Sequence, residues 1–438
     1  MPSRFKLNPE LTYYLMSGAM TLFDSTMFVF MTVFFFTVVG LNPLQLVLIG
    51  TVLEGSIFLF EVPTGVVADT YSRRLSVIIG ILTLGISFLV MGLSRTFPVV
   101  LISEVLSGLG YTFLSGATEA WLADEVGNEK VGPVLLRSGQ INRLLGILGI
   151  AVSAVLASVR LDLPILTGAV LYIILALVLA AIMPENHFKP FVQAANPPGL
   201  PALFGIDHMA ATFKEGARII RASPFLITLV VINFFVGTSS EGFDRLGDPH
   251  LITNFIFPAL VIPLLGALKP IIWFSIISLA GSVLSLLVVV IFRPHLERLT
   301  TDLGLTARAL ITLNLVIATC GVGFALAGSF PLAVVCLLLR GLAGALIWPL
   351  FTAYQVQSVP AHVRATVLSM TGQGNALGQV VGGPLVGWIG TRSLRAALVV
   401  AGLLILPNSF LYRDKPATDR LVDGETQKEQ AVINPEGD

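Results

Sequence analysis

Charged residues are scarce in this sequence, and the scarcity bounds the class of protein. Lys, Arg, Asp and Glu make up 12% of the 438 residues, whereas 55% are hydrophobic and the mean hydropathy is +0.87. Soluble domains carry about 25% charged residues. So few charges could not solubilise so much apolar surface, and we therefore expect a protein whose solvent is mostly lipid. The formal net charge of zero also argues against a nucleic-acid partner.

Cysteine and histidine are scarce as well. Cys320 and Cys336 both lie within apolar runs, so we expect core packing and not a disulfide framework. The five histidines fall in predicted loops or at predicted helix ends, and no pair has metal-ligand spacing on a helix face. The sequence also lacks a nucleotide-binding loop and a Gly-x-Ser-x-Gly elbow. We therefore predict no enzyme, no metal site and no cofactor.

Long apolar runs are what the sequence does contain. They are continuously apolar over about 20 residues, the length that a helix needs to cross a bilayer, and this continuity excludes the alternating strands of a membrane barrel. Segment 248–270 is too short to span because Pro258 and Pro263 interrupt it, and we expect a re-entrant or interfacial segment there. The predicted spans are 11–39, 44–68, 75–94, 98–123, 136–159, 164–183, 224–247, 271–292, 304–328, 331–357, 363–389 and 392–412.

Polar segments divide the chain into two halves. We expect an N-terminal half of six helices over residues 1–183 and a C-terminal half of six helices over residues 224–412. The linker 184–223 contains DHMAATFKEGARIIR, which predicts an amphipathic helix on the inner leaflet, with an ordinary basic linker as the alternative. The tail 413–438 is charged and aperiodic, so we expect it to be disordered. Two six-helix bundles joined by a linker are typical of transporters built from repeats.

Lysine and arginine predict the orientation of these helices. They concentrate in the segments that are cytoplasmic when both termini are cytoplasmic, and the opposite loops hold few of them. The fold prediction is therefore an all-α integral membrane protein with twelve transmembrane helices and both termini in the cytoplasm. We expect a multi-pass monomer in the cell inner (plasma) membrane.

The segment GVVADTYSRR stands out between the second and third predicted helices. Its Gly65, Ala68, Asp69, Arg73 and Arg74 resemble the signature loop of the major facilitator superfamily, whereas Thr70 and Ser72 depart from that signature. The resemblance covers nearly the whole chain. It implies a conformational latch made of Gly65, Asp69, Arg73 and Arg74, in which Asp69 caps a helix of the other half. The alternative is that the two arginines only mark the cytoplasmic face.

Ionisable residues inside the predicted spans are the candidates for the transport site, because charge at that depth is expensive. Carboxylates outnumber arginines there, so some must be protonated, wetted by a cavity or neutralised by a cationic substrate. Asp24 and Glu54 rank first for binding protons or cations, with neutralisation by Ser, Thr or Asn hydrogen bonds as the alternative. Glu61 could instead belong to a polar network near Asp69. Glu119 and Arg143 could instead form a buried structural ion pair. The candidates for proton coupling or substrate binding are Asp24, Glu54, Glu61, Glu119, Arg143, Asp244 and Arg340.

The first four predicted helices resemble one branch of the superfamily, the macrolide and multidrug efflux transporters. The run from Leu41 to Asp69 and the segment GATEAWLADEVG from Gly116 to Gly127 carry this resemblance. It implies export of hydrophobic or cationic small molecules in exchange for protons, with the proton gradient as the energy source. The predicted span 136–159 lacks the Gly-Pro pair usual in antiporters of this superfamily, and Glu104 stands where arginine is usual. A lysolipid or amphiphile transporter, a carrier without proton coupling, and a binding protein without flux remain alternatives.

Overall fold

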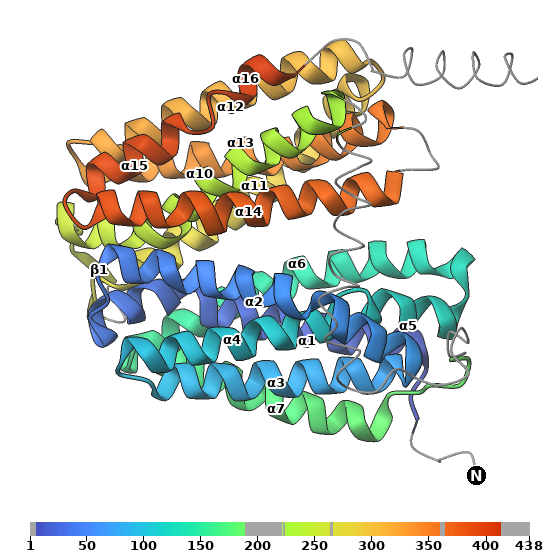
Figure 1. Cartoon of the computed structure of the whole chain (residues 1–438). Helices are drawn as coiled ribbons and strands as arrows, with labels where there is room; N and C mark the ends of the chain where they lie inside the picture. Colours follow the sequence, from blue (N-terminus) through green and yellow to red (C-terminus); the bar gives the residue numbers. More distant parts are fainter. Residues whose placement is uncertain (1–5, 189–220, 222–223, 263–265, 360–363, 413–438) are drawn as a thin grey trace, which may run out of the picture. The chain divides into compact units, whose positions relative to one another are not determined.

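A computed structural model of the chain describes residues 6–188, 221, 224–262, 266–359 and 364–412 (Figure 1). The predicted amphipathic helix of the linker and the predicted disorder of the tail lie outside these residues. The N-terminal helices are α1 (Pro9–Phe34) with its π-helical extension η1 (Phe35–Val39), α2 (Pro43–Thr70), α3 (Arg73–Leu93), α4 (Phe97–Leu114), α5 (Ala117–Val126), α6 (Asn128–Val159) and α7 (Leu163–Ile182). The later elements are α10 (Pro224–Asn254), β1 (Leu260–Ile262), β2 (Gly266–Leu268), α11 (Ile272–Leu299), α12 (Leu303–Leu326), α13 (Phe330–Ser358), α14 (Arg364–Gly390), α15 (Leu394–Leu403) and α16 (Asn408–Leu411).

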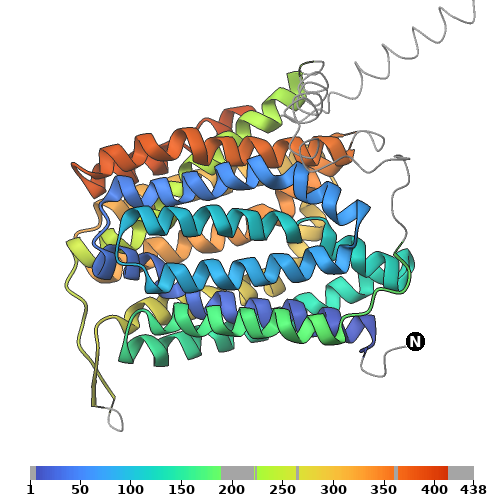
Figure 2. The ribbon, with the colours of Figure 1, turned by 60° about the horizontal axis from the view of Figure 1, so that its bottom comes forward.

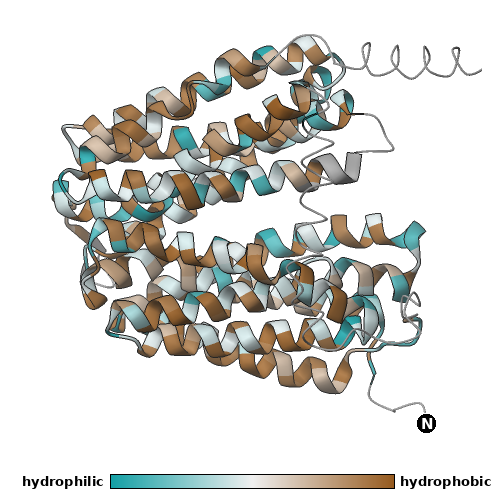
Figure 3. Ribbon diagram, in the orientation of Figure 1, coloured by the Kyte–Doolittle hydropathy of each residue, from teal (hydrophilic) through white to brown (hydrophobic). Residues whose placement is uncertain are grey.

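The helices have the length and hydropathy of membrane spans. Within the described residues, 11 helical segments are long and apolar enough to cross a bilayer, and Figure 3 shows hydrophobic residues along most of their lengths. The 27-residue α14 is not among them, because its central stretch GQGNALGQ is rich in glycine and amide side chains. The chain is thus an all-helical, multi-pass integral membrane protein with 11 to 12 membrane-length helices. The count of twelve spans and the cytoplasmic termini stay predictions.

The predicted fourth helix is two helices in the structure. α4 ends at Leu114 and α5 begins at Ala117, because Gly116 adopts a left-handed φ of 70° that breaks the helix and favours glycine. A second left-handed glycine, Gly127 with φ 81°, separates α5 from α6. The helix that corresponds to the predicted span 136–159 begins eight residues earlier, since α6 starts at Asn128. Continuous hydropathy hides such breaks because it is insensitive to backbone dihedral angles.

The N-terminal helices pack closely through small residues. α1 packs against α6 and α7, α3 against α4 and α7, and α2 against α4 (Figure 2). A Cβ at Gly149 of α6 would lie 2.6 Å from the Leu22 carbonyl oxygen of α1, so only glycine allows this approach. The Ser153 hydroxyl of α6 donates to the Thr26 carbonyl of α1 at 2.6 Å. In the core beside them, the Tyr172 ring meets the Phe23 and Phe88 rings at centroid distances of 5.6 and 5.5 Å.

The glycines that lower the hydropathy of α14 have a packing role. Gly374, Gly378 and Gly382 recur every fourth residue, and a Cβ at any of them would collide with Val230, Phe234 or Thr238 of α10. The Thr238 hydroxyl also donates to the Gly378 carbonyl at 2.9 Å. α14 is therefore suited to close packing on α10 by backbone approach. Helix α12 packs against α13 in the same compact unit of the chain.

Segment 248–270, expected to be re-entrant or interfacial, contains the end of α10 and then a two-stranded hairpin. β1 and β2 are antiparallel, with Leu260 opposite Leu268. The Trp273 indole N–H at the start of α11 donates to the Pro258 carbonyl at 2.9 Å and ties the base of the hairpin to that helix. Pro258 lies between the end of α10 at Asn254 and the first strand, where it has no backbone N–H to donate to a continuing helix.

By contact density the chain forms two compact units. One contains Met1–Met209, Asp244–Val283 and Gly383–Leu394, and the other contains Ala210–Phe243, Leu284–Gly382 and Arg395–Asp438. The six N-terminal spans thus fall together in the first unit, and the candidate site described next lies within that unit.

Candidate functional site

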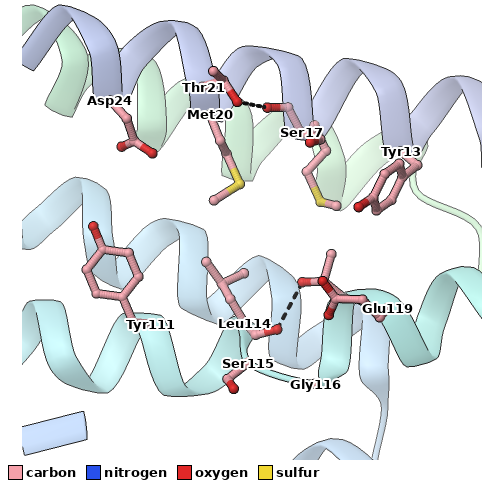
Figure 4. A pocket seen from close by; sticks show the side chains of 12 residues that line it. Tyr13, Ser17, Met20, Thr21, Asp24, Tyr111, Leu114, Ser115, Gly116 and Glu119 are labelled. Atoms are coloured by element: carbon pink, nitrogen blue, oxygen red, sulfur yellow. Dashed lines mark hydrogen bonds between the residues drawn. The ribbon is translucent and has the colours of Figure 1, made fainter. Parts of the chain in front are cut away.

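A cavity of about 450 Å³ lies between α1 and the junction of α4 with α5. Figure 4 shows Asp24 of α1 and Tyr111 of α4 facing each other at one end, and Tyr13 and Glu119 at the other end. Further lining comes from polar and thioether side chains of α1, namely Met16, Ser17, Met20 and Thr21. The predicted residues Asp24 and Glu119 thus share one cavity.

A second cavity of about 390 Å³ adjoins the first. Leu53, Glu54, Ile57 and Glu61 of α2 line it, and Tyr111 and Ser115 line both cavities. Glu54 and Glu61 are seven residues apart, which places them on one face of α2, about 10 Å apart along its axis. The end of α4 therefore supplies lining that is common to the α1 cavity and the α2 cavity.

The break between α4 and α5 explains why Ser115 reaches both cavities. Gly116 ends helical geometry at this point, and no heavy atom lies within 4 Å of the position where its Cβ would be. Ser115 therefore lies just beyond the end of α4, and its hydroxyl donates to Glu61 Oε1 at 2.7 Å. Glu119 lies in the first turn of α5, where the helix dipole favours a negative charge. The left-handed glycine thus brings a hydroxyl and a carboxylate to the site.

Asp24 has a partner that the sequence did not reveal. The Tyr172 hydroxyl of α7 donates to Asp24 Oδ1 at 2.6 Å, and Tyr172 itself is fully buried. The donors expected for this carboxylate from the sequence were Ser, Thr and Asn side chains, and the observed donor is a tyrosine. Tyr172 lies in the apolar run GAVLYIILALVL, in which its hydroxyl is the sole polar side-chain group. A lone hydroxyl in an apolar run indicates that it needs a buried hydrogen-bond partner, but only the packing of α7 on α1 shows that this partner is Asp24.

Both cavities are acidic. Together they contain Asp24, Glu54, Glu61 and Glu119, and none of the described residues that line them is lysine, arginine or histidine. Arg245 of α10, which belongs to the same compact unit, attracts the Glu54 carboxylate electrostatically. With four carboxylates, an aromatic wall and apolar side chains, the arrangement is suited to binding organic cations.

The other predicted site residues lie outside these two cavities. Arg143 is exposed on α6, and Glu119 and Arg143 do not pair with each other in the described part of the chain. Asp244 is exposed on α10. Arg340 of α13 places its guanidinium carbon 3.9 Å from the ring centroid of Phe243, which is a cation–π contact.

The signature segment forms ion pairs at one end of the N-terminal helices. Arg73 contacts Asp124 of α5 at 2.6 Å and Asp69 at 3.4 Å. Its guanidinium also donates to the Ala120 carbonyl at 3.1 Å. Arg73 therefore joins the α2–α3 turn to α5, the same short helix that carries Glu119 into the first cavity. Gly65 has open space at its Cβ position: among the described residues outside its own stretch of helix, no heavy atom lies within 4 Å of it.

Arg74 holds the end of α7. Its side chain donates to the Met183 and Ala180 carbonyls at 2.8 and 2.5 Å, which are acceptors that the helix end leaves unpaired. Glu185 accepts the Arg74 backbone N–H at 2.9 Å and the Ser72 hydroxyl at 2.7 Å. Both arginines thus have structural partners within the N-terminal helices. The predicted contact of Asp69 with the other half stays a prediction.

Apolar spans that enclose acidic, drug-sized cavities define an integral membrane protein with a small-molecule site. The sequence pattern of the Major Facilitator Superfamily matches residues 14–268 and 250–435, and the chain belongs to this family. The family and the fold make it a membrane transporter of small molecules and not an enzyme.

Individual relatives agree with this assignment. The chain is 23% identical over 378 residues to the uncharacterized MFS-type transporter YxaM of Bacillus subtilis (strain 168), covering 85% of this chain and 88% of YxaM. Among solved structures, the nucleoside transporter NupG matches with a TM-score of 0.70 at 15% identity, over 93% of this chain and 98% of NupG. A bacterial homologue of the human lysosomal transporter Spinster, in an inward-facing and unoccupied conformation, also gives 0.70, at 14% identity over 92% and 95% of the two chains. These structural likenesses show the fold alone.

Proposed function

We propose that this protein is a secondary active transporter that exports hydrophobic or cationic small molecules in exchange for protons, by alternating access. The observation that carries the proposal is the pair of adjoining acidic cavities on α1, α2 and the α4–α5 junction. Transporters of this kind bind substrate near the middle of the membrane and then expose the site to the other side by movement of the two halves.

The lining supports a cationic, partly apolar substrate. Volumes of about 450 and 390 Å³ match the range of sites for drug-sized ligands. The Tyr111 ring offers a face for a cation or an aromatic group, and Met16 and Met20 supply adaptable apolar contacts. Substrate carboxylates or phosphates would meet repulsion from the four acidic residues. This supports a cationic substrate over an anionic one.

The same carboxylates support exchange for protons. A carboxylate that binds either a proton or a cationic substrate, but not both, couples the two movements in opposite directions. Asp24 is half-buried, and the Tyr172 hydroxyl holds its orientation, so a proton or a cation approaches it from the cavity side. The proton gradient then supplies the energy and no cofactor is needed. Such a carrier acts in the cell inner (plasma) membrane, and its site is complete in a monomer.

The ion pairs of Arg73 support a conformational role for the signature segment. α5 lies between two left-handed glycines, lines the first cavity through Glu119 and pairs with Arg73 through Asp124. We propose that Gly65, Asp69, Arg73 and Arg74 act as the latch that biases the inward and outward states. Three candidates lie outside the cavities, namely Arg143, Asp244 and Arg340. Substituting them tests whether the transport site extends beyond the two cavities.

Reconstitution tests the proposal. The purified chain is placed in liposomes with an acidic lumen, and lipophilic cationic dyes, macrolides or a fluorescent lysolipid are added outside. We expect the cationic dyes to enter while protons leave the lumen, and Asp24→Asn to abolish the proton movement. Substrate movement that ignores the pH gradient would overturn proton antiport, and transport of the lysolipid alone would favour an amphiphile carrier.

A further inference from the structure

We propose that the two cavities are two subsites of one binding site, and that the preferred substrate is an elongated dication. One positive group lies beside Asp24, the other beside Glu54, and the Tyr111 ring packs against the connecting segment. This inference rests on the proposed function and narrows its substrate class.

The shared wall makes the two cavities one site. Tyr111 and Ser115 line both, so a molecule that passes along this wall touches α1 residues at one end and α2 residues at the other. α4 packs against α2 and, through its junction with α5, faces α1 across the first cavity. The carboxylates of the first cavity therefore come from α1 and α5, and those of the second come from α2.

The distribution of charge matches two separated positive groups. Asp24 and Glu119 belong to the first cavity, and Glu54 and Glu61 belong to the second. Two cationic groups attached to one flexible chain repel each other less as their separation grows. Placing one in each cavity gives each cationic group carboxylates of its own. A compact monocation fills one cavity and leaves the carboxylates of the other without an organic cation.

The partners of these carboxylates are consistent with this assignment. The Tyr172 hydroxyl orients Asp24, and the Ser115 hydroxyl orients Glu61, so each cavity contains one carboxylate fixed by a neutral donor. Arg245 offsets part of the charge on Glu54, and Glu61 adds a second negative charge on the same face of α2. The lining of the α2 cavity thus remains acidic, and a cationic group competes there with Arg245.

Two matched probes test the proposal on the full-length protein in lipid nanodiscs. One is an N-alkyl quinolinium, a monocation, and the other is a bis-quinolinium alkane with the same ring at each end of the chain. We expect the dication to bind at least about tenfold more tightly, equivalent to about 1.4 kcal/mol. Glu54→Gln should remove this gain while changing binding of the monocation less than about twofold. Glu129→Gln, at an exposed position in the first turn of α6, is the control and should change neither.

Three outcomes overturn the inference. The two probes could bind equally to the parent protein, or Glu54→Gln could weaken both by the same factor although its thermal unfolding is unchanged. A bis-quinolinium joined by a single methylene is too short to reach both cavities, and a gain in its affinity equal to that of the long dication would also contradict bridging. Failure of the proposed function differs from these results, since the probes would then bind without proton-coupled transport, or not bind at all.

Discussion

Tyr172 of α7 donates a hydrogen bond of 2.6 Å to Asp24 of α1, and this bond joins the aromatic core to the first acidic cavity. The Tyr172 ring packs between Phe23 and Phe88, so the hydroxyl is held in place by its neighbours. Asp24 is thereby presented to the cavity in one orientation.

A double-mutant cycle measures this bond. Tyr172→Phe keeps the ring packing and removes the donor, and Asp24→Asn removes the charge of the acceptor. We expect each single change to destabilise the protein, with a coupling of about 1.5–3 kcal/mol, because hydrogen bonds to charged groups contribute that much. Denaturant unfolding in detergent gives the free energies. Additive effects of the two changes would mean that the bond contributes nothing to stability.

Substitution of the cavity carboxylates should uncouple transport. In Asp24→Asn or Glu54→Gln the side chain can no longer exchange a proton for a cation, so we expect substrate movement to lose its dependence on the pH gradient. Proteoliposome assays with dye and proton readouts measure this, with Glu129→Gln as the control. Gradient-driven transport at the parent rate in both variants would exclude these two residues from coupling.

Asp69→Asn should affect conformational balance more than stability. The Asp69 side chain is 59% exposed and its ion pair with Arg73 is long at 3.4 Å, whereas Arg73 keeps Asp124 at 2.6 Å. Exposed pairs contribute about 0–1 kcal/mol, so we expect unfolding to change little. Turnover should fall several-fold while substrate affinity is retained. Distance distributions between spin labels on the two halves should show a changed ratio of inward-open to outward-open states. Identical distance distributions in the parent and the variant would contradict the latch.

An ion-pair cluster in the turns opposite the signature segment predicts a pH effect. Asp162, before α7, accepts from Arg160 and Arg95 at 2.6 and 2.9 Å. Burial alone would raise the pKa of Asp162, but the hydrogen bonds and charge of Arg160, together with Arg95, outweigh it and lower the pKa. The cluster therefore stabilises the fold fully above about pH 4, the ordinary aspartate pKa, and this contribution is lost as the pH falls through the lower folded value.

Asp162→Asn tests this cluster. We expect a loss of about 1–3 kcal/mol at neutral pH, discounted because both arginines are partly exposed. Thermal unfolding followed from pH 7 towards pH 3 should show that the difference between parent and variant narrows in acid. A difference independent of pH would show that packing, and not the charge of Asp162, is responsible.

Gly378 and Gly344 form a matched pair for the packing of α14. A methyl group at Gly378 would collide with the Phe234 carbonyl of α10, whereas no heavy atom lies within 4 Å of a Cβ built at Gly344 of α13. We therefore expect Gly378→Ala to destabilise by about 1–3 kcal/mol and Gly344→Ala to be neutral or slightly stabilising. Thermal unfolding in detergent compares them, and equal effects of the two changes would refute the close approach of α10 and α14.

Hydropathy determined most of the fold. Backbone groups in lipid must be paired within a helix, so runs such as 164–183 had only one available structure, and the observed α7 covers Leu163–Ile182. The low charge content also identified Asp24, Glu54, Glu61 and Glu119 as candidates, since each carboxylate at depth requires a reason. All four line the two cavities. The cost of burying charge made them candidates from the sequence alone, together with Arg143, Asp244 and Arg340, which lie outside the cavities.

Only the tertiary structure decided how these residues meet. The Gly116 break depends on a backbone dihedral angle, and the approach of α14 to α10 depends on glycines whose spacing is also compatible with a loop. The Tyr172–Asp24 bond joins residues 148 positions apart, and the hairpin at Leu260–Leu268 forms in a stretch as apolar as the helices around it. Such features depend on distances between distant segments, whereas hydropathy reports only the solvent that each segment prefers.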